Sequence, residues 1–489
     1  MKKNKVLLII ILTSLLLFSI SVPITAKKED KLAKKPKLPS NGEMFNWVKD
    51  LCSFGYRRPG TEADHQAIQY ISEKFEDFGL VDVVIEPVDI PLWDVEEWSL
   101  TVNGEEIPSF YMQHTYWISE FEGFTEPSIT APIVYIGEGT EEDYANTNVE
   151  GKIVLGDIRF ETLYWDFVVY FSNFWYDPYN TIPPGWNHPA VWRGINFQGM
   201  YNRAVENGAV GFIGILMDYY DRNTFYPENP LMMPIPGLYL SKSDGAYVKE
   251  LLQNEEPDEA TLVLDGSIVP AVAKNVIGFL PGKTEDIILI HSHHDAPFYG
   301  AVEDAAGVAG VLGLAKYFCQ FPAESREKTF MFVTLDTHFN DYQAHNDFIE
   351  NHEDHLSKVI VDVCLEHIAK EIVEIDRELV ETGFVEPRGM FITENDYLNS
   401  FAEEAVLKYG LERTALLPTD TPLGVPTDAM WFFGMGIPII SFISGPPYIY
   451  DIVDTPNKVP VDQLKPITAA FAMMIESIDA TPPELIRSS

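Results

Sequence analysis

Imidazole and carboxylate side chains are concentrated at the end of one apolar segment. The sequence His-Ser-His-His-Asp at 291–295 directly follows Ile287–Ile290, and two acids, Glu303 and Asp304, come at the start of the next apolar pattern. Neutral imidazole and carboxylate oxygen are the ligands that zinc and similar divalent ions take in proteins. If the apolar segment is a strand of an open α/β sheet, these side chains lie at its carboxyl end, where sites form.

The histidines of the chain are strongly clustered. Eight of the 11 histidines lie between His291 and His367. This clustering favours a chemical role over chance. Three of the eight, His345, His352 and His355, lie in a polar stretch with a helical pattern, and we expect them to be ordinary polar residues of a helix.

The elements that must position these residues alternate in type from about residue 271 onward. Apolar segments of strand length alternate with longer segments of helical periodicity. This alternation predicts an α/β domain with a mostly parallel sheet that helices cover on both faces. The predicted strands are 329–335, 359–363 and 437–442, and the predicted helices are 305–318 and 399–409.

The first half of the chain has a different composition. Residues 41–80 have helical periodicity and 81–102 alternate like strands. From 127 to 266 the chain is rich in Gly, Pro and aromatic residues, with short strand-like segments, which predicts a separate β-rich domain inserted before the second half. Within it, Leu163–Tyr179 is crowded with Trp, Tyr and Phe. This stretch is either a recognition surface or the packing of an inserted loop.

The N-terminus has the pattern of a targeting segment. Three lysines within the first five residues precede a largely apolar run from Val6 to Ile24. Residues 1–26 are therefore interpreted as a signal peptide or an uncleaved membrane anchor, followed by a Lys-rich tether at 27–40. We expect the protein to be secreted, or anchored to the membrane by this segment.

Composition excludes some classes of function. The 489 residues carry 74 acids against 34 bases, a net charge of -40, which argues against nucleic acid as a partner. Three cysteines, Cys52, Cys319 and Cys364, lie far apart and form neither a disulfide framework nor a metal site of the CxxC type. The oligomeric state leaves no trace in the sequence.

Several fragments, taken in order, resemble one known family. Val149–Leu155 and Arg203–Gly211 resemble a protease-associated domain, and Asn275–Gly282 resembles the start of a catalytic domain. Together with Gly55–Thr61 and the helix after it, they resemble the di-zinc aminopeptidase and carboxypeptidase family that includes aminopeptidase Y and glutamate carboxypeptidase. The resemblance covers most of the mature chain. It implies a catalytic domain at 41–126 and 267–489, with a protease-associated domain inserted at 127–266.

The resemblance also implies roles for individual residues. His293 falls on a zinc ligand, and Asp295 on the carboxylate that orients this imidazole. Glu303 falls on the carboxylate that bridges two metal ions, with Asp304 as the neighbouring substitute. Glu366 falls on a further acidic ligand.

Three positions depart from the family pattern. His338 stands where the family has its general base, Phe339 stands at a ligand position, and Tyr450 stands where the last histidine ligand is expected. No histidine follows His367. Since imidazole can replace carboxylate as a ligand, His338 and His367 are candidates to complete a rearranged site for one or two zinc ions.

These residues predict a metal-dependent peptidase, with an aminopeptidase as the leading hypothesis and a peptide or protein as substrate. His338 would take a proton from the attacking water, as imidazole does near neutral pH. Two alternatives stay open. The chain is a catalytically inactive, peptidase-like binding or receptor protein, or it is another amide hydrolase on the same fold.

Overall fold

The computed structural model describes residues 36–115, 127–228, 233–254 and 258–487. All the elements below belong to one compact unit that begins at Lys37. The segment expected to be a signal peptide or anchor lies outside the described residues. Within the described ranges, no helix has the length and apolar character needed to cross a membrane.

A mixed sheet forms the centre of the C-terminal half. Its four central strands are parallel neighbours, as the alternation of strands and helices predicts, and antiparallel strands flank them. The four central strands are β13 (Thr329–Leu335), β12 (Ile287–His293), β14 (Val359–Leu365) and β19 (Ile439–Ser444), in this order across the sheet. β11 (Glu259–Leu280) lies beside β13, and β17 (Arg388–Ile392) followed by β18 (Thr414–Pro418) lies beside β19. The predicted α/β fold with a helix-flanked sheet is confirmed.

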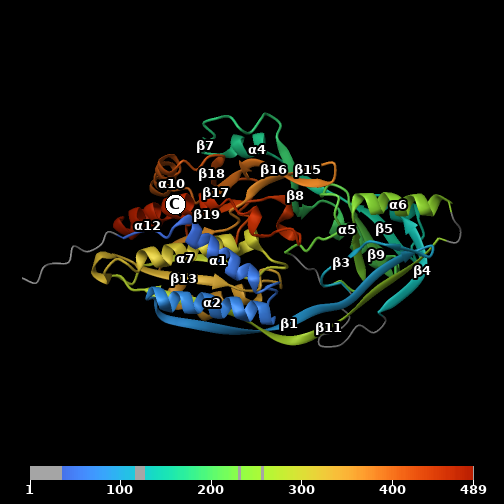
Figure 1. Ribbon diagram of the computed structural model, residues 1–489, viewed down its shortest axis with the longest axis horizontal. Coiled ribbons are helices and arrows are strands. Elements are labelled where there is room, and N and C mark those ends of the chain that lie inside the picture. Colours follow the sequence, from blue (N-terminus) through green and yellow to red (C-terminus); the bar gives the residue numbers. More distant parts are fainter. Residues whose placement is uncertain (1–35, 116–126, 229–232, 255–257, 488–489) are drawn as a thin grey trace, which may run out of the picture. The chain divides into compact units, whose positions relative to one another are not determined.

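Helices cover both faces of this sheet (Figure 1). Ile288 and Ile290 of β12 belong to the apolar core on one face, whereas Leu289 packs with Phe348 and Phe432 on the other. Because alternate strand residues point to opposite faces, a strand buried on both sides is a continuous apolar run. The first face carries α1 (Asn41–Ser53), α2 (Glu62–Phe78), α7 (Ala306–Phe318) and α12 (Val461–Ala480), with α10 (Asp396–Tyr409) packed on α12, and the second carries α8 (Gln343–Asn351) and α11 (Ala429–Gly434).

Local sequence fixes both ends of α2. The side chain of Thr61 accepts a hydrogen bond from the backbone N–H of Asp64, which satisfies a free donor in the first turn. At the other end Gly79 has φ 99°, a left-handed conformation that glycine adopts without strain. The buried face of the helix carries Ile68 and Phe75. The capped first turn therefore holds Asp64 at a defined place.

A long antiparallel ribbon connects the main sheet to a second sheet. β1 (Val81–Val102) pairs with β11 along almost its whole length, and the far end of β11 pairs with β4 (Ser128–Tyr135). Figure 1 shows this ribbon running beneath the molecule. The second sheet continues in the order β4, β5 (Ile153–Ile158), β9 (Gly211–Leu216), β10 (Gly237–Leu240) and β3 (Phe110–Tyr111). Hydrogen bonding thus runs without a break across the predicted boundary at 266, and β3 joins this sheet from before residue 127.

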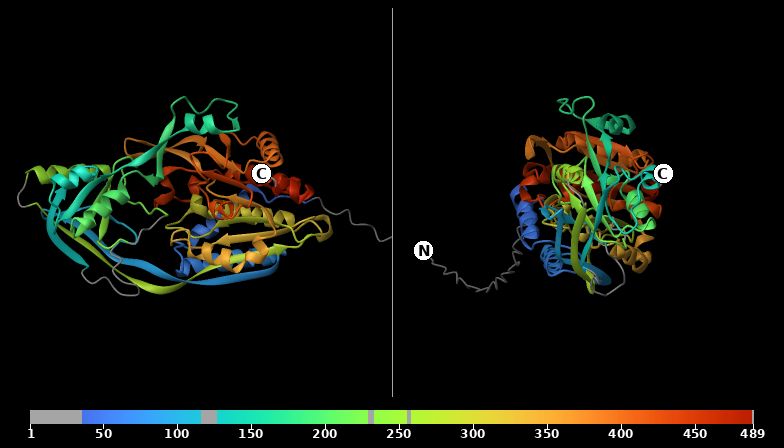
Figure 2. Two further views of the ribbon diagram at one scale, coloured as in Figure 1. Left: turned by 180° about the vertical axis from the view of Figure 1, so that it is seen from behind. Right: turned by 90° about the vertical axis from the view of Figure 1, so that its right-hand side faces the viewer.

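One segment of the insert, residues 160–194, leaves the second sheet and is called the arm below. Its strands β6 (Phe160–Tyr164) and β8 (Asn187–Gly194) pair with each other. Between them lie α4 (Trp165–Phe171) and β7 (Phe174–Tyr176), and β7 pairs with β18 at the edge of the main sheet (Figures 1 and 2). Trp165 packs with Phe391 and Leu417 of the main sheet. At least some of the aromatic residues at 163–179 therefore serve to pack an inserted loop against the main sheet.

Candidate metal centre

Three neighbouring parallel strands bring their carboxyl ends to one edge of the sheet. His293 is the last residue of β12, and His338 and His367 follow closely after β13 and β14. All three imidazoles are at most 4% exposed. The edge at which these strands end is where open α/β sheets form their sites.

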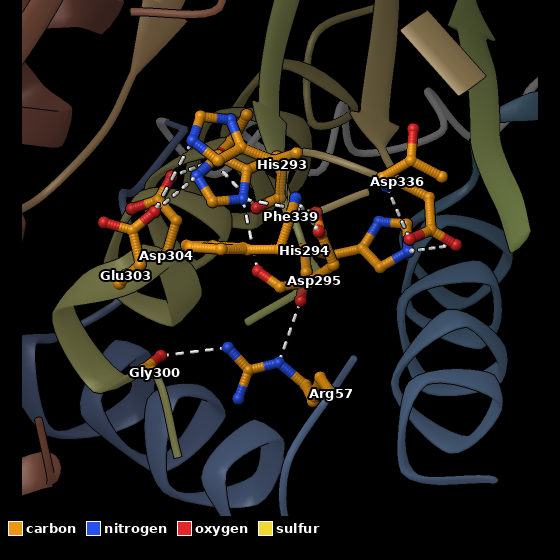
Figure 3. Close-up of polar contacts among 12 residues, drawn as sticks. Arg57, His293, His294, Asp295, Gly300, Glu303, Asp304, Asp336 and Phe339 are labelled. Atoms are coloured by element: carbon orange, nitrogen blue, oxygen red, sulfur yellow. Dashed lines mark hydrogen bonds and ion pairs between the residues drawn. The ribbon is translucent and has the colours of Figure 1, made fainter. Parts of the chain in front are cut away.

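Glu303 faces two of these imidazoles. The side chain is fully buried, with Oε1 3.1 Å from Nε2 of His293 and Oε2 2.6 Å from Nε2 of His367. Figure 3 shows His293 and Glu303 pointing toward one another. The carboxylate of Asp454 accepts the backbone N–H groups of Val302 and Glu303 at 2.9 and 3.0 Å, and so holds the loop that carries Glu303.

The other ring nitrogen of each of these two imidazoles faces an oxygen acceptor. Nδ1 of His293 lies 3.2 Å from the carbonyl oxygen of Asp295, and Nδ1 of His367 lies 3.0 Å from that of Ser444. Since these acceptors take a hydrogen from Nδ1, the neutral ring has its lone pair on Nε2, the atom directed at Glu303. This is the arrangement of a metal-ligating histidine.

His338 completes the group from the far side. Its ring stacks on His293 with centroids 4.0 Å apart. Nδ1 lies 2.8 Å from Oδ1 of Asp428, and Nε2 lies 3.9 Å from Glu303 and 3.6 Å from Glu228. Asp428 therefore orients His338 so that its Nε2 faces Glu303 and Glu228.

The unsatisfied atoms of this group fit a metal ion. Nε2 of His293, His338 and His367 and both oxygens of Glu303 are buried and make no hydrogen bond in the described part of the chain. A nitrogen lone pair and a carboxylate oxygen at such short distances repel unless a cation lies between them. Two ligands of one tetrahedral zinc ion are roughly 3.3 Å apart. The 3.1 Å between Glu303 and His293 is close to this value, whereas the 2.6 Å between Glu303 and His367 would widen around an ion. By residue type, His293, Glu303 and His367 match the donor set of a zinc-like ion.

In the metal-free protein, protons occupy the same positions. Burial opposes a charge on His367, but the adjoining Glu303 carboxylate outweighs it and raises the pKa of His367 to about 9. The pKa of Glu303, which burial alone would raise, is held well below its usual value, chiefly by His367 and His293. A metal ion must displace these protons, so metal and protons compete for the site.

The structure places the remaining predicted residues around this group. Asp295 lies with Oδ1 3.4 Å from Nδ1 of His293, and its Oδ2 accepts the backbone N–H of Phe339 at 2.9 Å. The carboxylate of Asp304 accepts the backbone N–H of His367 at 2.9 Å and bonds the hydroxyl of Ser292. Asp304 thus holds the backbone at His367 in place, and its carboxylate is not part of the group of converging ligand atoms.

Glu366 points to a different place from its neighbour. Its Oε1 accepts the backbone N–H of Asp428 at 2.9 Å and the thiol of Cys364 at 3.1 Å. Among the described residues, the ligand atoms of His293, Glu303 and His367 lie within 4.8 Å of one another, and so do those of His293, His338 and Asp428. Glu366 belongs to neither group.

Two residues of the site carry no role in the sequence interpretation. Asp428 belongs to the Thr427-Asp428 pair before Gly436-Ile437-Pro438, which resembles a Ser-Asp pair of the family named above, and this pair is the signal that could have identified it. Glu228 comes from the insert and lies in no motif. The hydroxyl of Tyr450, which stands at the expected histidine position, donates to Glu228.

A cavity of about 480 Å³ opens beside this group. Glu228, His338, His367 and Tyr450 are among the residues that line it. Much of the remaining wall is apolar and comes from both the arm and the main sheet, including Leu163, Trp165, Trp192, Phe391, Leu423 and Ile443. The aromatic stretch of the arm therefore both packs on the sheet and lines the space next to the imidazoles.

Comparison with known proteins gives one family match, in the C-terminal half of the chain. Residues 275–475, which contain His293, His338, His367 and Glu303, match the sequence model of the family described as Peptidase family M28. No curated protein sequence matches the chain.

Solved structures share the fold over nearly the whole chain. An aminopeptidase from Aneurinibacillus sp. strain AM-1 is 20% identical, with 89% of this chain and 93% of that chain covered and a TM-score of 0.60. BSAP, a zinc aminopeptidase from Bacillus subtilis, is 18% identical, with 90% and 95% covered and a TM-score of 0.66. A peptidase M28 precursor from Shewanella amazonensis SB2B is 19% identical, with 90% and 93% covered and a TM-score of 0.66. The chain therefore has the fold of M28 aminopeptidases.

The proton occupancy of the site predicts how the metal-free protein responds to pH. The pKa of His367 is about 9 in the folded chain and about 6.5 in an unfolded one, so its stabilising contribution is complete below pH ~6.5. It is lost as the pH rises through 9. We expect the free energy of unfolding of chelator-treated protein, measured by urea titration, to fall between these pH values. His367→Gln should flatten this decrease, and an equally steep decrease in that variant would contradict the assignment.

Proposed function

We propose that the protein is a metal-dependent peptidase that removes the N-terminal residue of a peptide. The observation that carries the proposal is the convergence of His293, His367 and Glu303 with buried, unsatisfied ligand atoms. Zinc held by these residues would lower the pKa of a water molecule and polarise the carbonyl group of the substrate. The match to Peptidase family M28 and the fold shared with zinc aminopeptidases support this reaction class.

His338 is the residue that handles the proton. His338 lines the cavity, and Oδ1 of Asp428 lies 2.8 Å from its Nδ1. Burial opposes a charge on His338, but Tyr342, Asp428 and Glu228 outweigh it and raise its pKa. A divalent ion bound beside the ring would lower this pKa again, and the neutral imidazole could then accept a proton at Nε2. The imidazolium that forms can then return the proton to the leaving amine. By the family resemblance, His338 would stand at the position of the base, with an imidazole in place of a carboxylate.

The charges around the cavity favour a free N-terminus over a free C-terminus. Glu161, Glu228 and Asp428 line the cavity. Arg193, an arginine of the lining, donates to the carbonyl oxygen of Leu423 at 2.6 Å and lies 3.4 Å from Glu161. A substrate ammonium group is therefore attracted, whereas a terminal carboxylate meets carboxylates and an arginine that is already bonded. This balance supports an aminopeptidase.

The apolar wall of the cavity selects the side chain that is cleaved off. Pockets of roughly 300–1,000 Å³ with apolar walls and few polar groups bind their ligands mainly by burying apolar surface. The cavity of about 480 Å³ belongs to this class. We infer that the preferred substrates are peptides with a large apolar or aromatic N-terminal residue.

Features outside the site complete the proposal. The Val149–Leu155 and Arg203–Gly211 segments support a protease-associated domain as the identity of the insert. The lysines and apolar run at the N-terminus support a secreted or membrane-anchored protein.

One observation favours the alternative of an inactive binding protein: Phe339 and Tyr450 occupy ligand positions, so a second metal ion lacks the family's donors.

Hydrolysis of aminoacyl amides by zinc-loaded protein tests the proposal. We expect turnover of N-terminally unblocked substrates, none of N-acetylated ones, and loss of activity with a zinc chelator. His293→Ala and Glu303→Gln should each lower kcat/KM at least about a thousandfold, because each removes a donor to the ion that stabilises the transition state.

The control for that assay is His355→Ala, which changes a half-buried histidine outside the cluster and should leave kcat/KM unchanged. Absence of turnover over a full panel of residues, in a folded protein with bound zinc, would favour the binding-protein alternative.

Substrate preference is tested at Leu423. Leu423→Ala removes an apolar group from the wall and should lower kcat/KM for a phenylalanyl substrate about tenfold, with a much smaller effect on an alanyl substrate. Tyr170→Ala is a matched control, because Tyr170 lies on the same arm and is 80% exposed. Equal losses for both substrates would show that the cavity does not hold the side chain.

A further inference from the structure

A second group of ligand atoms lies next to the candidate metal centre, on the other side of the end of β12. Asp64, His294 and Asp336 are completely buried, and their ligand atoms lie within 4.8 Å of one another. Nε2 of His294 is 3.6 Å from Oδ1 of Asp64 and 3.8 Å from Oδ2 of Asp336. In Figure 3 the ring of His294 points toward Asp336, away from the ring of His293.

Backbone N–H groups from three separate segments of the chain hold the two carboxylates in place. Oδ2 of Asp64, in the first turn of α2, accepts the N–H of Gly60 at 2.9 Å. Asp336, directly after β13, accepts the N–H of Thr337 on Oδ1 and that of Lys274 on Oδ2, both at 2.7 Å. These bonds leave Oδ1 of Asp64 free to face His294.

Neither the imidazole nor that oxygen has a hydrogen-bond partner. Both ring nitrogens of His294 and Oδ1 of Asp64 are buried and unbonded in the described part of the chain. Arg57 does not bond the carboxylates, because its guanidinium donates to the carbonyl oxygens of His294 and Gly300 (Figure 3) and to that of Tyr299. Burial raises the pKa of both carboxyl groups, to about 7 for Asp336, so the pair is fully ionised only when a cation lies beside it.

We propose that Asp64, His294 and Asp336 bind a structural divalent cation, separate from the metal centre that includes His293. One nitrogen and two oxygen donors suit zinc or manganese, whereas calcium needs six to eight oxygens and magnesium an octahedral oxygen set. The two carboxylates balance the charge of a divalent ion. A water molecule would supply a fourth ligand.

The position of this ion gives it a positioning role. It joins the first turn of α2 to the ends of β12 and β13. His293 precedes His294 in the chain, and His338 follows Asp336 by two residues. The ion therefore fixes the two strand ends from which the stacked imidazoles extend.

Anomalous diffraction from crystals of the full chain soaked in zinc chloride, measured on both sides of the zinc edge, tests the proposal. We expect a peak between Asp64, His294 and Asp336 in addition to any peak at His293. The same test with manganese chloride covers the other candidate ion. Absence of a peak there in both soaks overturns the proposal, and a proton shared by the two carboxylates then explains the geometry.

Metal counting in solution separates this ion from the first centre. In the double variant His293→Ala, His367→Ala, we expect about one bound ion per chain after desalting and a rise in Tm on addition of zinc chloride. Adding Asp64→Asn to this background should remove both the ion and the rise in Tm. Adding Glu62→Gln, an exposed acid in the same helical turn, should leave both unchanged. Retention of the ion in the Asp64→Asn protein also overturns the proposal.

Discussion

The contact between the buried Glu303 carboxylate and the ring nitrogens of His293 and His367 is the constraint on which the rest of the site depends. Burying a carboxylate costs several kcal/mol unless it is paired, and here the facing atoms are lone pairs when the rings are neutral. A cation must join them, either as protons on the rings or as a metal ion. The surrounding polar groups serve this contact: Asp454 holds the loop of Glu303, and Ser444 directs His367.

The departures from the family pattern have structural counterparts in the insert. Tyr450, which stands where the family resemblance places a histidine ligand, donates its hydroxyl to Glu228, and Phe339 packs edge-on against Tyr226 of the insert. Glu228 also lies 3.6 Å from Nε2 of His338. The insert therefore contributes a carboxylate to the group as well as the aromatic wall of the cavity. A change of ligand in the main domain is thus linked to a contact between the two parts of the chain.

The sequence predicts what depends on local pattern. Apolar periodicity correctly predicts β13 and β14, and short spacing places His293 and Glu303 near one strand end. It does not predict that His367 rather than Glu366 turns toward Glu303, because that depends on the left-handed backbone of His367, with φ 48°. Nor does it find Glu228, because the contact with His338 joins residues more than a hundred positions apart and no motif marks it.

The acidity of the chain extends into its interior at this edge of the sheet. Fully or almost fully buried carboxylates surround the strand ends, and the nearby arginine, Arg57, donates to carbonyl oxygens. Histidines are thus the basic groups that face the acids, and each deprotonated imidazole leaves a negative charge unbalanced. Cations bound at both groups would remove this imbalance at neutral pH, and one strand end could then hold one group of ligands around His293 and another around His294. The carboxylates concerned are Asp64, Asp295, Glu303, Asp304, Asp336, Glu366, Asp428 and Asp454.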